Sequence, residues 1–135
     1  MRIVADINVL VSAFIFPGGA PEAVYRFVLE RRIELVSSRP LLAELGRVLT
    51  DKFGWEPERA QRAVEQLVRL ADVVEPREEV MDIGVDPADN RVLEAAAEGG
   101  ADVIISGDRH LIELSSWRRI AIERPAAFLE RLPED

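Results

Sequence analysis

The fold of this chain is decided by the stretch Asp102-Val103-Ile104-Ile105-Ser106-Gly107-Asp108, an apolar run that ends in an acid and leads directly into a helical pattern. Residues Arg2–Ala5 form a similar short run, which ends at Asp6 and is followed by another helical pattern. In an open parallel α/β sheet, the carboxyl ends of the strands form the ligand crevice. We therefore expect Asp6 and Asp108 to face a binding site rather than bulk solvent.

Short apolar runs alternate with helical patterns along the rest of the chain. The residues expected in strands are 2–5, 33–36, 73–75, 103–106 and 120–122, and those expected in helices are 8–14, 21–31, 40–53, 57–71, 88–98, 111–114 and 126–132. Near-continuous Val and Ile runs separated by helices indicate a parallel sheet with both faces covered. The predicted fold class is α/β: a single domain over residues 1–135, with a central parallel sheet of four to five strands flanked by helices on both faces.

The composition narrows the possible classes of protein. A chain of 135 residues with 48% apolar residues suits one domain with a full-sized core. No apolar stretch approaches the roughly 20 residues that span a bilayer, and Asp6 interrupts the region where a signal peptide would be apolar. We expect a soluble, cytoplasmic protein without a membrane partner. The absence of cysteine excludes disulfides, thiolate metal sites and a cysteine nucleophile, so any metal must be held mainly by oxygen.

The charge balance limits the ways in which the chain could bind nucleic acid. A net charge of −8, from 25 acids against 17 bases, argues against a protein that coats nucleic acid through a general positive field. A divalent ion bound among acids reverses the sign of the potential at that site. A metal-dependent nuclease is therefore compatible with the acidic composition, and so is an acidic surface that serves only solubility.

The acids at the two strand ends differ in their expected local tasks. Asn8 is expected to cap the helix that follows the first strand, which leaves Asp6 without a structural task, and the alternative is that Asp6 only helps to begin that helix. Gly107 is expected to let the backbone turn sharply, so that the Ser106 hydroxyl and the Asp108 carboxylate both project from the strand end. Capping of the next helix is an alternative role for Asp108.

Two further acids are candidates for the same site. The sequence Asp86-Pro87-Ala88-Asp89-Asn90 reads as a helix start with Asp86 as the N-cap, so Asp89 is the better ligand candidate and Asp86 a supporting group. A purely structural role is the alternative, because acids in the first turn complement the helix dipole. Glu44 lies about 100° from the centre of the apolar stripe of its helix, and such a border position can face either a crevice or water.

Four segments, taken together, resemble the PIN-domain family. Its members carry an acid after the first strand, a Glu in a middle helix, an Asp opening a later helix, and an Asp that follows a hydroxyl residue and a glycine at the next strand end. The segments that carry the resemblance, which extends over nearly the whole chain, are Asp6-Ile7-Asn8-Val9-Leu10-Val11-Ser12-Ala13, Leu42-Ala43-Glu44-Leu45, Asp86-Pro87-Ala88-Asp89-Asn90-Arg91-Val92-Leu93-Glu94-Ala95-Ala96 and Ser106-Gly107-Asp108-Arg109-His110-Leu111.

The resemblance implies a small metal-dependent ribonuclease, similar to the prokaryotic PIN proteins described as toxins of toxin–antitoxin systems. It implies a Mg²⁺ or Mn²⁺ site in which the matching acids Asp6, Glu44, Asp89 and Asp108 are both metal ligands and catalytic residues. The supporting polar groups would be Asn8, Asp86 and Ser106. The implied partners are an RNA substrate, a cognate antitoxin protein and a second copy of the chain in a homodimer.

Other classes of protein remain as alternatives. A phosphoryl-accepting domain, such as a receiver or a phosphatase, also gathers acids around Mg²⁺ but needs a lysine near the phosphate, and the one lysine, Lys52, is expected in a helix far from any strand end. A non-catalytic module that uses the fold to bind a protein partner is a second alternative. A ribonuclease with paired imidazoles is excluded, because His110 is the single histidine. Arginines that could contact an RNA backbone are Arg31, Arg32, Arg39, Arg109, Arg118 and Arg119.

Overall fold

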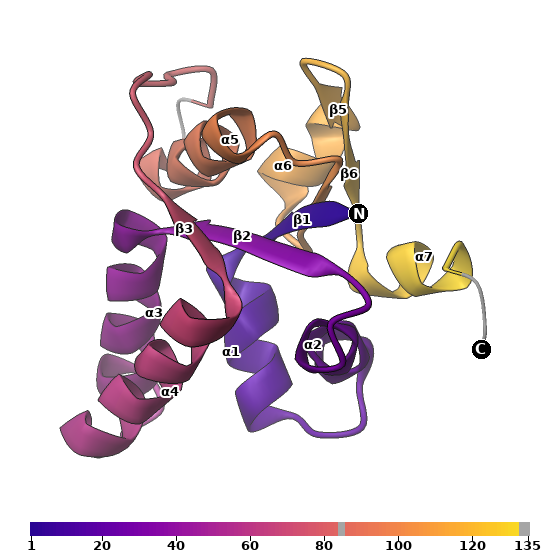
Figure 1. Ribbon diagram of the computed structural model, residues 1–135. Helices are drawn as coiled ribbons and strands as arrows, with labels where there is room; N and C mark the ends of the chain where they lie inside the picture. Colours follow the sequence, from indigo (N-terminus) through magenta and orange to yellow (C-terminus); the bar gives the residue numbers. More distant parts are fainter. Residues whose placement is uncertain (84–85, 133–135) are drawn as a thin grey trace.

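The computed structural model describes residues 1–83 and 86–132, and its centre is a twisted sheet (Figure 1). The strands in this part of the chain are β1 (Arg2–Ala5), β2 (Glu34–Ser38), β3 (Asp72–Val74), β4 (Val103–Ile105), β5 (Ser116–Trp117) and β6 (Ile120–Glu123). Their order across the sheet is β3-β2-β1-β4-β6-β5. All neighbouring pairs are parallel except β5 with β6, which is antiparallel. The predicted α/β class and parallel sheet are confirmed.

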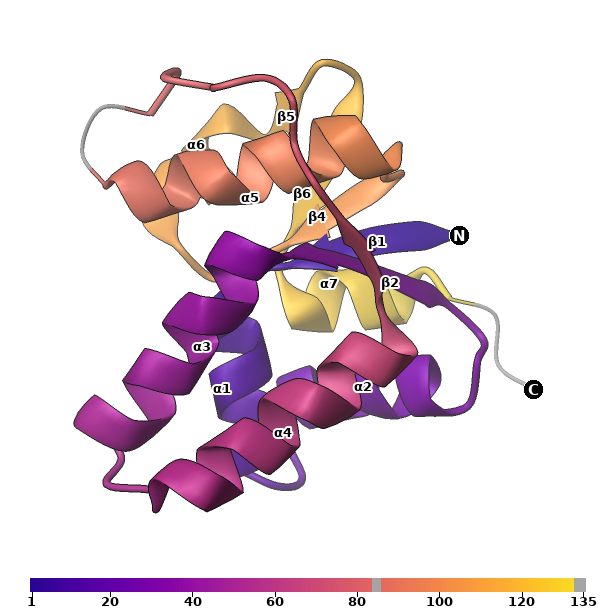
Figure 2. The same ribbon diagram turned by 60° about the vertical axis from the view of Figure 1, so that its left-hand side comes forward.

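Helices cover both faces of this sheet, as the two views in Figures 1 and 2 show. Helices α5 and α6 lie on one face, and α1, α2 and α7 lie on the other, where α2 packs against both α1 and α7. Helices α3 and α4 pack against each other, and α3 also contacts α1. The bounds are α1 (Ile7–Ile15), α2 (Ala20–Leu29), α3 (Arg39–Asp51), α4 (Pro57–Leu70), α5 (Pro87–Gly99), α6 (Arg109–Leu114) and α7 (Pro125–Glu130).

The strand order places a crevice between β1 and β4. From β1 the chain builds the sheet outward through β2 and β3 on one side, and later through β4 and β6 on the other. At such a point of reversal, the connections leave the neighbouring strand ends in opposite directions, and ligands of open α/β sheets bind there. Asp6 follows β1 directly, and Ser106 follows β4 directly. The sheet topology therefore brings the two acidic strand ends together.

The sheet contains one strand more than the predicted four to five. The added strand is the two-residue β5, which pairs antiparallel with β6 through Trp117 and Ile120. Two residues are too few to show an alternating pattern, so no sequence signal for this strand exists. The other predicted elements are present, with ends that differ by at most two residues.

The observed helix ends contradict two expectations, that Gly107 provides the turn after its strand and that Asn8 caps the first helix. Gly100, with φ of 61°, ends α5 in the left-handed conformation that glycine adopts without a Cβ clash. Gly107 is not in that region, so the turn after β4 does not need glycine for its backbone angles. Asp6, rather than Asn8, is the N-cap of α1, because its Oδ1 accepts a hydrogen bond from the Asn8 backbone N–H at 3.3 Å. Asn8 is already inside the first turn.

The core is formed by both faces of β1, β2 and β4 with the apolar sides of the helices, and most strand residues are fully buried. Helix α5 approaches the sheet so closely that a Cβ added at Gly99 would lie 2.4 Å from Cγ1 of Val36. Glycine at this position therefore allows the close packing of α5 on β2. This contact fixes the height of α5, which carries Asp89, above the sheet.

No single helix in the described residues is both long and apolar enough to cross a membrane, and only α1 with α2, a pair bent by 96°, meets the criteria of length and composition together.

Candidate functional site

The ends of β1, β4 and β6 are joined by backbone hydrogen bonds. The N–H of Asp6 donates to the carbonyl of Ile105 at 2.9 Å, and the N–H of Ser106 donates to the carbonyl of Glu123 at 3.0 Å. These bonds continue the ladders for one residue beyond the strands. The side chains that follow the three strands are therefore held at one edge of a rigid sheet.

Ser106 connects the first and last acids of the site. Its hydroxyl, which is fully buried, donates to Oδ2 of Asp6 at 2.8 Å and accepts a hydrogen bond from the backbone N–H of Asp108 at 2.9 Å. One oxygen thus fixes both the carboxylate of Asp6 and the backbone of Asp108. The predicted supporting position of Ser106 beside the acids agrees with this geometry.

Replacement of Ser106 by alanine is expected to destabilise the fold by about 1–3 kcal/mol, because it leaves the buried Asp6 oxygen and the Asp108 N–H without their partner. Urea unfolding at neutral pH measures this change, with Ser115→Ala, an exposed serine, as the control. A loss of stability in Ser106→Ala no larger than in the control would contradict the bridging role.

Asp89 is the acid with the most unusual surroundings. It lies in the first turn of α5, is only 4% exposed, and its Oδ2 has no hydrogen-bond partner within the described residues. Burial raises the pKa of Asp89 to about 7, and the charges of Asp108, Asp6 and Asp86 add to this effect. A carboxyl group that is buried, unpaired and surrounded by other acids is poorly accommodated unless a proton or a cation joins it.

Asp6 shares this environment. Its pKa is raised above the usual range, mainly by burial, although hydrogen bonds from Ser106 and from the Asn8 N–H act in the opposite direction. The charges of Asp108 and Asp86 raise it further. The charges of Asp86 and Asp108 therefore act on both Asp6 and Asp89, as expected for carboxylates that gather at one place.

Three of these aspartates also cap helices. Asp6 caps α1, Asp86 caps α5 by accepting from the Ala88 N–H at 2.9 Å, and Asp108 caps α6 by accepting from the His110 N–H at 2.8 Å. The predicted N-cap at Asp86 and the capping alternative for Asp108 are thus both present in the structure. A cap uses only part of the acceptor capacity of a carboxylate, which has about four lone-pair positions on its two oxygens. Capping therefore positions these groups without preventing them from binding a cation.

Glu44 is placed differently from the aspartates. It is half-exposed on α3, and its Oε2 pairs with Nη2 of Arg47 at 2.6 Å. It is not among the principal charges that raise the pKa of Asp6 or Asp89. The structure brings together Asp6, Asp89, Asp108 and Asp86, while the carboxylate of Glu44 faces its helix neighbour.

The donor chemistry of the site fits a hard divalent cation. Mg²⁺ and Mn²⁺ take oxygen ligands, the cluster offers carboxylates, and Oδ2 of Asp89 is buried without a partner. As the side chains lie, residues 1–83 and 86–132 contain no group of three or more carboxylates or imidazoles arranged to hold an ion. The predicted ligands therefore fit such an ion by their chemistry and neighbourhood, and their role as ligands stays a prediction.

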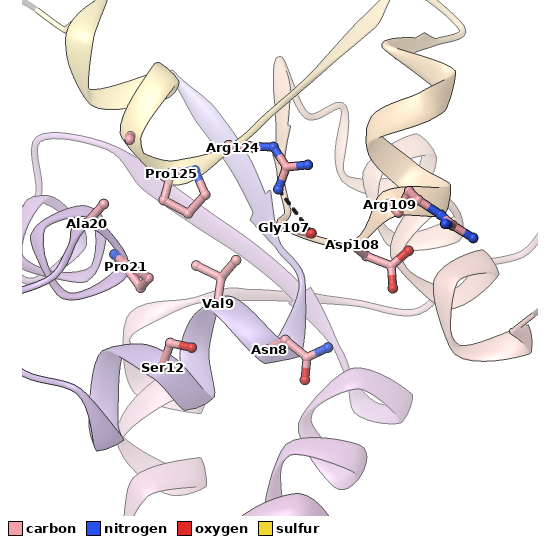
Figure 3. A pocket seen from close by; sticks show the side chains of 11 residues that line it. Asn8, Val9, Ser12, Ala20, Pro21, Gly107, Asp108, Arg109, Arg124 and Pro125 are labelled. Atoms are coloured by element: carbon pink, nitrogen blue, oxygen red, sulfur yellow. Dashed lines mark hydrogen bonds between the residues drawn. The ribbon is translucent and has the colours of Figure 1, made fainter.

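A cavity of about 640 Å³ opens beside Asp108, between the first turns of α1, α2 and α7 (Figure 3). Arg109, one of the arginines considered from the sequence, lines it. Arg124, which was not considered, also lines it and donates from Nη1 to the carbonyl of Gly107 at 3.2 Å. The signal for Arg124 is its place directly after β6, at the same sheet edge as the acids, whereas the predicted site residues at strand ends were Asp6, Ser106 and Asp108.

Residues 2–110 match the PIN domain family, and this range includes all the aspartates of the site. The chain belongs to the PIN-domain family. PIN domains are generally nucleases that use divalent metals. An uncharacterized protein of Methanocaldococcus jannaschii is 30% identical to this PIN domain over 142 residues, which cover 96% of this chain and 90% of that protein.

Solved structures share the fold of this PIN domain. VapBC-1 from nontypeable Haemophilus influenzae aligns with a TM-score of 0.62 at 17% identity over 93% of this chain and 99% of that chain. VapBC2 from Rickettsia felis, solved bound to a DNA fragment from its promoter, aligns with a TM-score of 0.63 at 14% identity over 92% and 98%. A protein from Pyrobaculum aerophilum aligns with a TM-score of 0.60 at 15% identity over 96% and 87%. The structural neighbours thus include VapBC toxin–antitoxin proteins.

Proposed function

We propose that this PIN domain is a metal-dependent ribonuclease that hydrolyses phosphodiester bonds inside RNA chains. The observation that carries the proposal is the unpaired Oδ2 of Asp89, buried at the point of strand reversal among the charges of Asp6 and Asp108. An acid cluster of this kind costs stability unless a cation neutralises it, so its presence argues for a ligand with positive charge. Membership of a family of nucleases supplies the reaction class.

Each acid has a distinct part in the proposed site. Asp6, fixed by Ser106, and Asp89, whose Oδ2 has no hydrogen-bond partner among the described residues, would be direct ligands, and Asp108 would supply a third carboxylate at the open side facing the cavity. A bound Mg²⁺ or Mn²⁺ would lower the pKa of a water molecule and stabilise the leaving oxygen of the phosphodiester. Asp86 and Asn8 would support the ligands from the helix ends.

Glu44 completes the proposed set of ligands only if it leaves its present partner. Its ion pair with Arg47 lies on the surface, and an exposed pair of this kind is worth about 1 kcal/mol or less. A divalent cation offers a larger gain in charge interaction, so the side chain can turn toward the site or reach the metal through a water molecule. The role of Glu44 as a ligand stays a prediction.

The test is cleavage of a single-stranded RNA by the purified chain in Mn²⁺ or Mg²⁺, compared with the same reaction in excess chelator. We expect cleavage that requires the metal and yields internal fragments. Cleavage that persists in chelator would contradict the proposal. The absence of cleavage in either metal would instead favour the non-catalytic, protein-binding module that the sequence leaves open.

We further infer that the chain acts in the cytoplasm as the toxin of a toxin–antitoxin pair, as a homodimer bound by an antitoxin protein. The support is its structural likeness to VapBC proteins, which at this identity concerns the fold. Induced expression in a bacterial host is expected to arrest growth, whereas Asp89→Asn is not. Equal growth of both strains at equal protein levels would contradict the toxin role while leaving the nuclease chemistry in place.

A further inference from the structure

The cavity beside Asp108 has a wall suited to a flat apolar ring. Its sides include Val9 of α1, Pro21 of α2 and Pro125 of α7, which face one another in Figure 3. At about 640 Å³ it lies within the range of roughly 300–1,000 Å³ that is typical of small-molecule sites. Part of this wall comes from α7, which lies outside the residues that match the PIN domain family.

Two polar side chains beside this apolar wall have no hydrogen-bond partners among the described residues. The side chains of Asn8 and Ser12, one turn apart on α1, line the cavity, and neither forms a hydrogen bond with any residue of 1–83 or 86–132. An amide offers two N–H donors and a carbonyl acceptor, and a hydroxyl can donate and accept. Apolar surface with free amide and hydroxyl groups at its edge matches a nucleobase, which has apolar faces and hydrogen-bonding edges.

Two arginines mark the side of the cavity near the acids. Arg124 uses Nη1 to bond the Gly107 carbonyl, which holds its guanidinium next to the turn that carries Asp108, and its other N–H groups have no partner in the described chain. Arg109 makes only an exposed contact with Glu113 at 3.5 Å, which is worth little. Both guanidinium groups therefore have N–H donors that can bind phosphate oxygens.

We propose that this cavity is a nucleotide subsite, which takes the base of an unstacked RNA nucleotide while Arg124 holds a phosphate next to the scissile one. The inference rests on the proposed ribonuclease function, because Asp108 belongs to both the acid cluster and the cavity. A base can enter only after leaving a helical stack, so the subsite selects single-stranded RNA over duplex RNA.

The test uses a pair of matched variants on α7. Ala126 and Ala127 are both exposed, but only Ala126 lines the cavity, so Ala126→Phe would fill it while Ala127→Phe makes the same change outside it. The measurement is the Kd of a dye-labelled single-stranded RNA of ten nucleotides, by fluorescence anisotropy in chelator, where cleavage cannot occur. A duplex of the same sequence is the second probe. Melting temperatures of both variants check that they fold.

We expect Ala126→Phe to raise the Kd for the single strand by about tenfold, the effect of losing one well-held base, and Ala127→Phe to change it by less than about twofold. Arg124→Gln should raise the same Kd several-fold, whereas Arg62→Gln, an exposed arginine on α4 outside the cavity, should not. The duplex should bind more weakly than the single strand and be insensitive to Ala126→Phe.

The outcomes separate the subsite from the nuclease function. Unchanged binding in Ala126→Phe, together with metal-dependent cleavage by the wild type, would overturn the subsite and leave the function standing. Weakened binding in Ala126→Phe without any metal-dependent cleavage would support the subsite and overturn the ribonuclease proposal. A wild-type chain that binds neither RNA probe in chelator would overturn the subsite, and the absence of metal-dependent cleavage as well would overturn both.

Discussion

Replacement of Asp89 by asparagine is expected to lower the rate of Mn²⁺-dependent RNA cleavage by at least about 100-fold. The change keeps the size and shape of the side chain but removes the charge of a carboxylate whose Oδ2 is buried without a hydrogen-bond partner among the described residues. Loss of such a ligand removes several kcal/mol of charge stabilisation, and each 1.4 kcal/mol corresponds to about a factor of ten in rate.

The control for this effect is Asp51→Asn, which makes the same chemical change at an exposed position at the end of α3. Initial rates with a single-stranded RNA at saturating Mn²⁺ should be unchanged in this variant. Equal rates for wild type, Asp51→Asn and Asp89→Asn would assign the cleavage to a contaminating nuclease. The same comparison for Glu44→Gln measures whether the fourth predicted acid takes part.

The second expected result is that Asp89→Asn is more stable than the wild type at pH 8 in chelator, and about equally stable near pH 4. In the folded chain the pKa of Asp89 is raised to about 7, mainly by burial. Between pH 4 and pH 7 the folded state therefore retains a proton that the unfolded chain has released, so the stability of the wild type falls as the pH rises through this window. Above about pH 7 the wild type has lost all of the stability that the retained proton on Asp89 provides.

The gain expected at pH 8 is at least about 4 °C in melting temperature, which corresponds to roughly 1 kcal/mol for a chain of this length, because burial of the charged Asp89 carboxylate lowers the stability of the wild type. The lost first-turn charge of α5 acts in the opposite direction by a few tenths of a kcal/mol, which is smaller. Mn²⁺ should raise the melting temperature of the wild type at pH 8 more than at pH 5, because protonated Asp89 cannot bind metal. Thermal unfolding in chelator and in Mn²⁺ measures both effects.

A wild-type melting temperature that does not fall between pH 5 and pH 8 in chelator would contradict the raised pKa of Asp89. An increase with Mn²⁺ that is equal in wild type and Asp89→Asn would show that the metal binds elsewhere. Asp51→Asn again serves as the control, since it leaves the acid cluster intact.

The spacing of apolar residues and the positions of proline and glycine predicted most of the secondary structure. The runs at 103–106 and 2–5 predicted two strands of a parallel sheet, because apolar stretches of that length between helices are buried on both faces. The caps were harder to assign. Asp6 and Asn8 are both good capping residues two positions apart, and the choice between them depends on where the backbone leaves β1, which is set by the bond from the Asp6 N–H to Ile105.

The sequence by itself determined the α/β class, the alternation of strands and helices along the chain, the parallel sheet and the aspartates at strand and helix ends. These features follow from local patterns of apolar and acidic residues. Only the tertiary structure decided which charges act on one another. Burial and the approach of α5 to the sheet gave Asp89 its raised pKa, and Glu44 was paired with Arg47 instead. The cavity with Arg124 also needed the packing of α7 beside α2, because desolvation and charge interactions depend on distances that no local pattern contains.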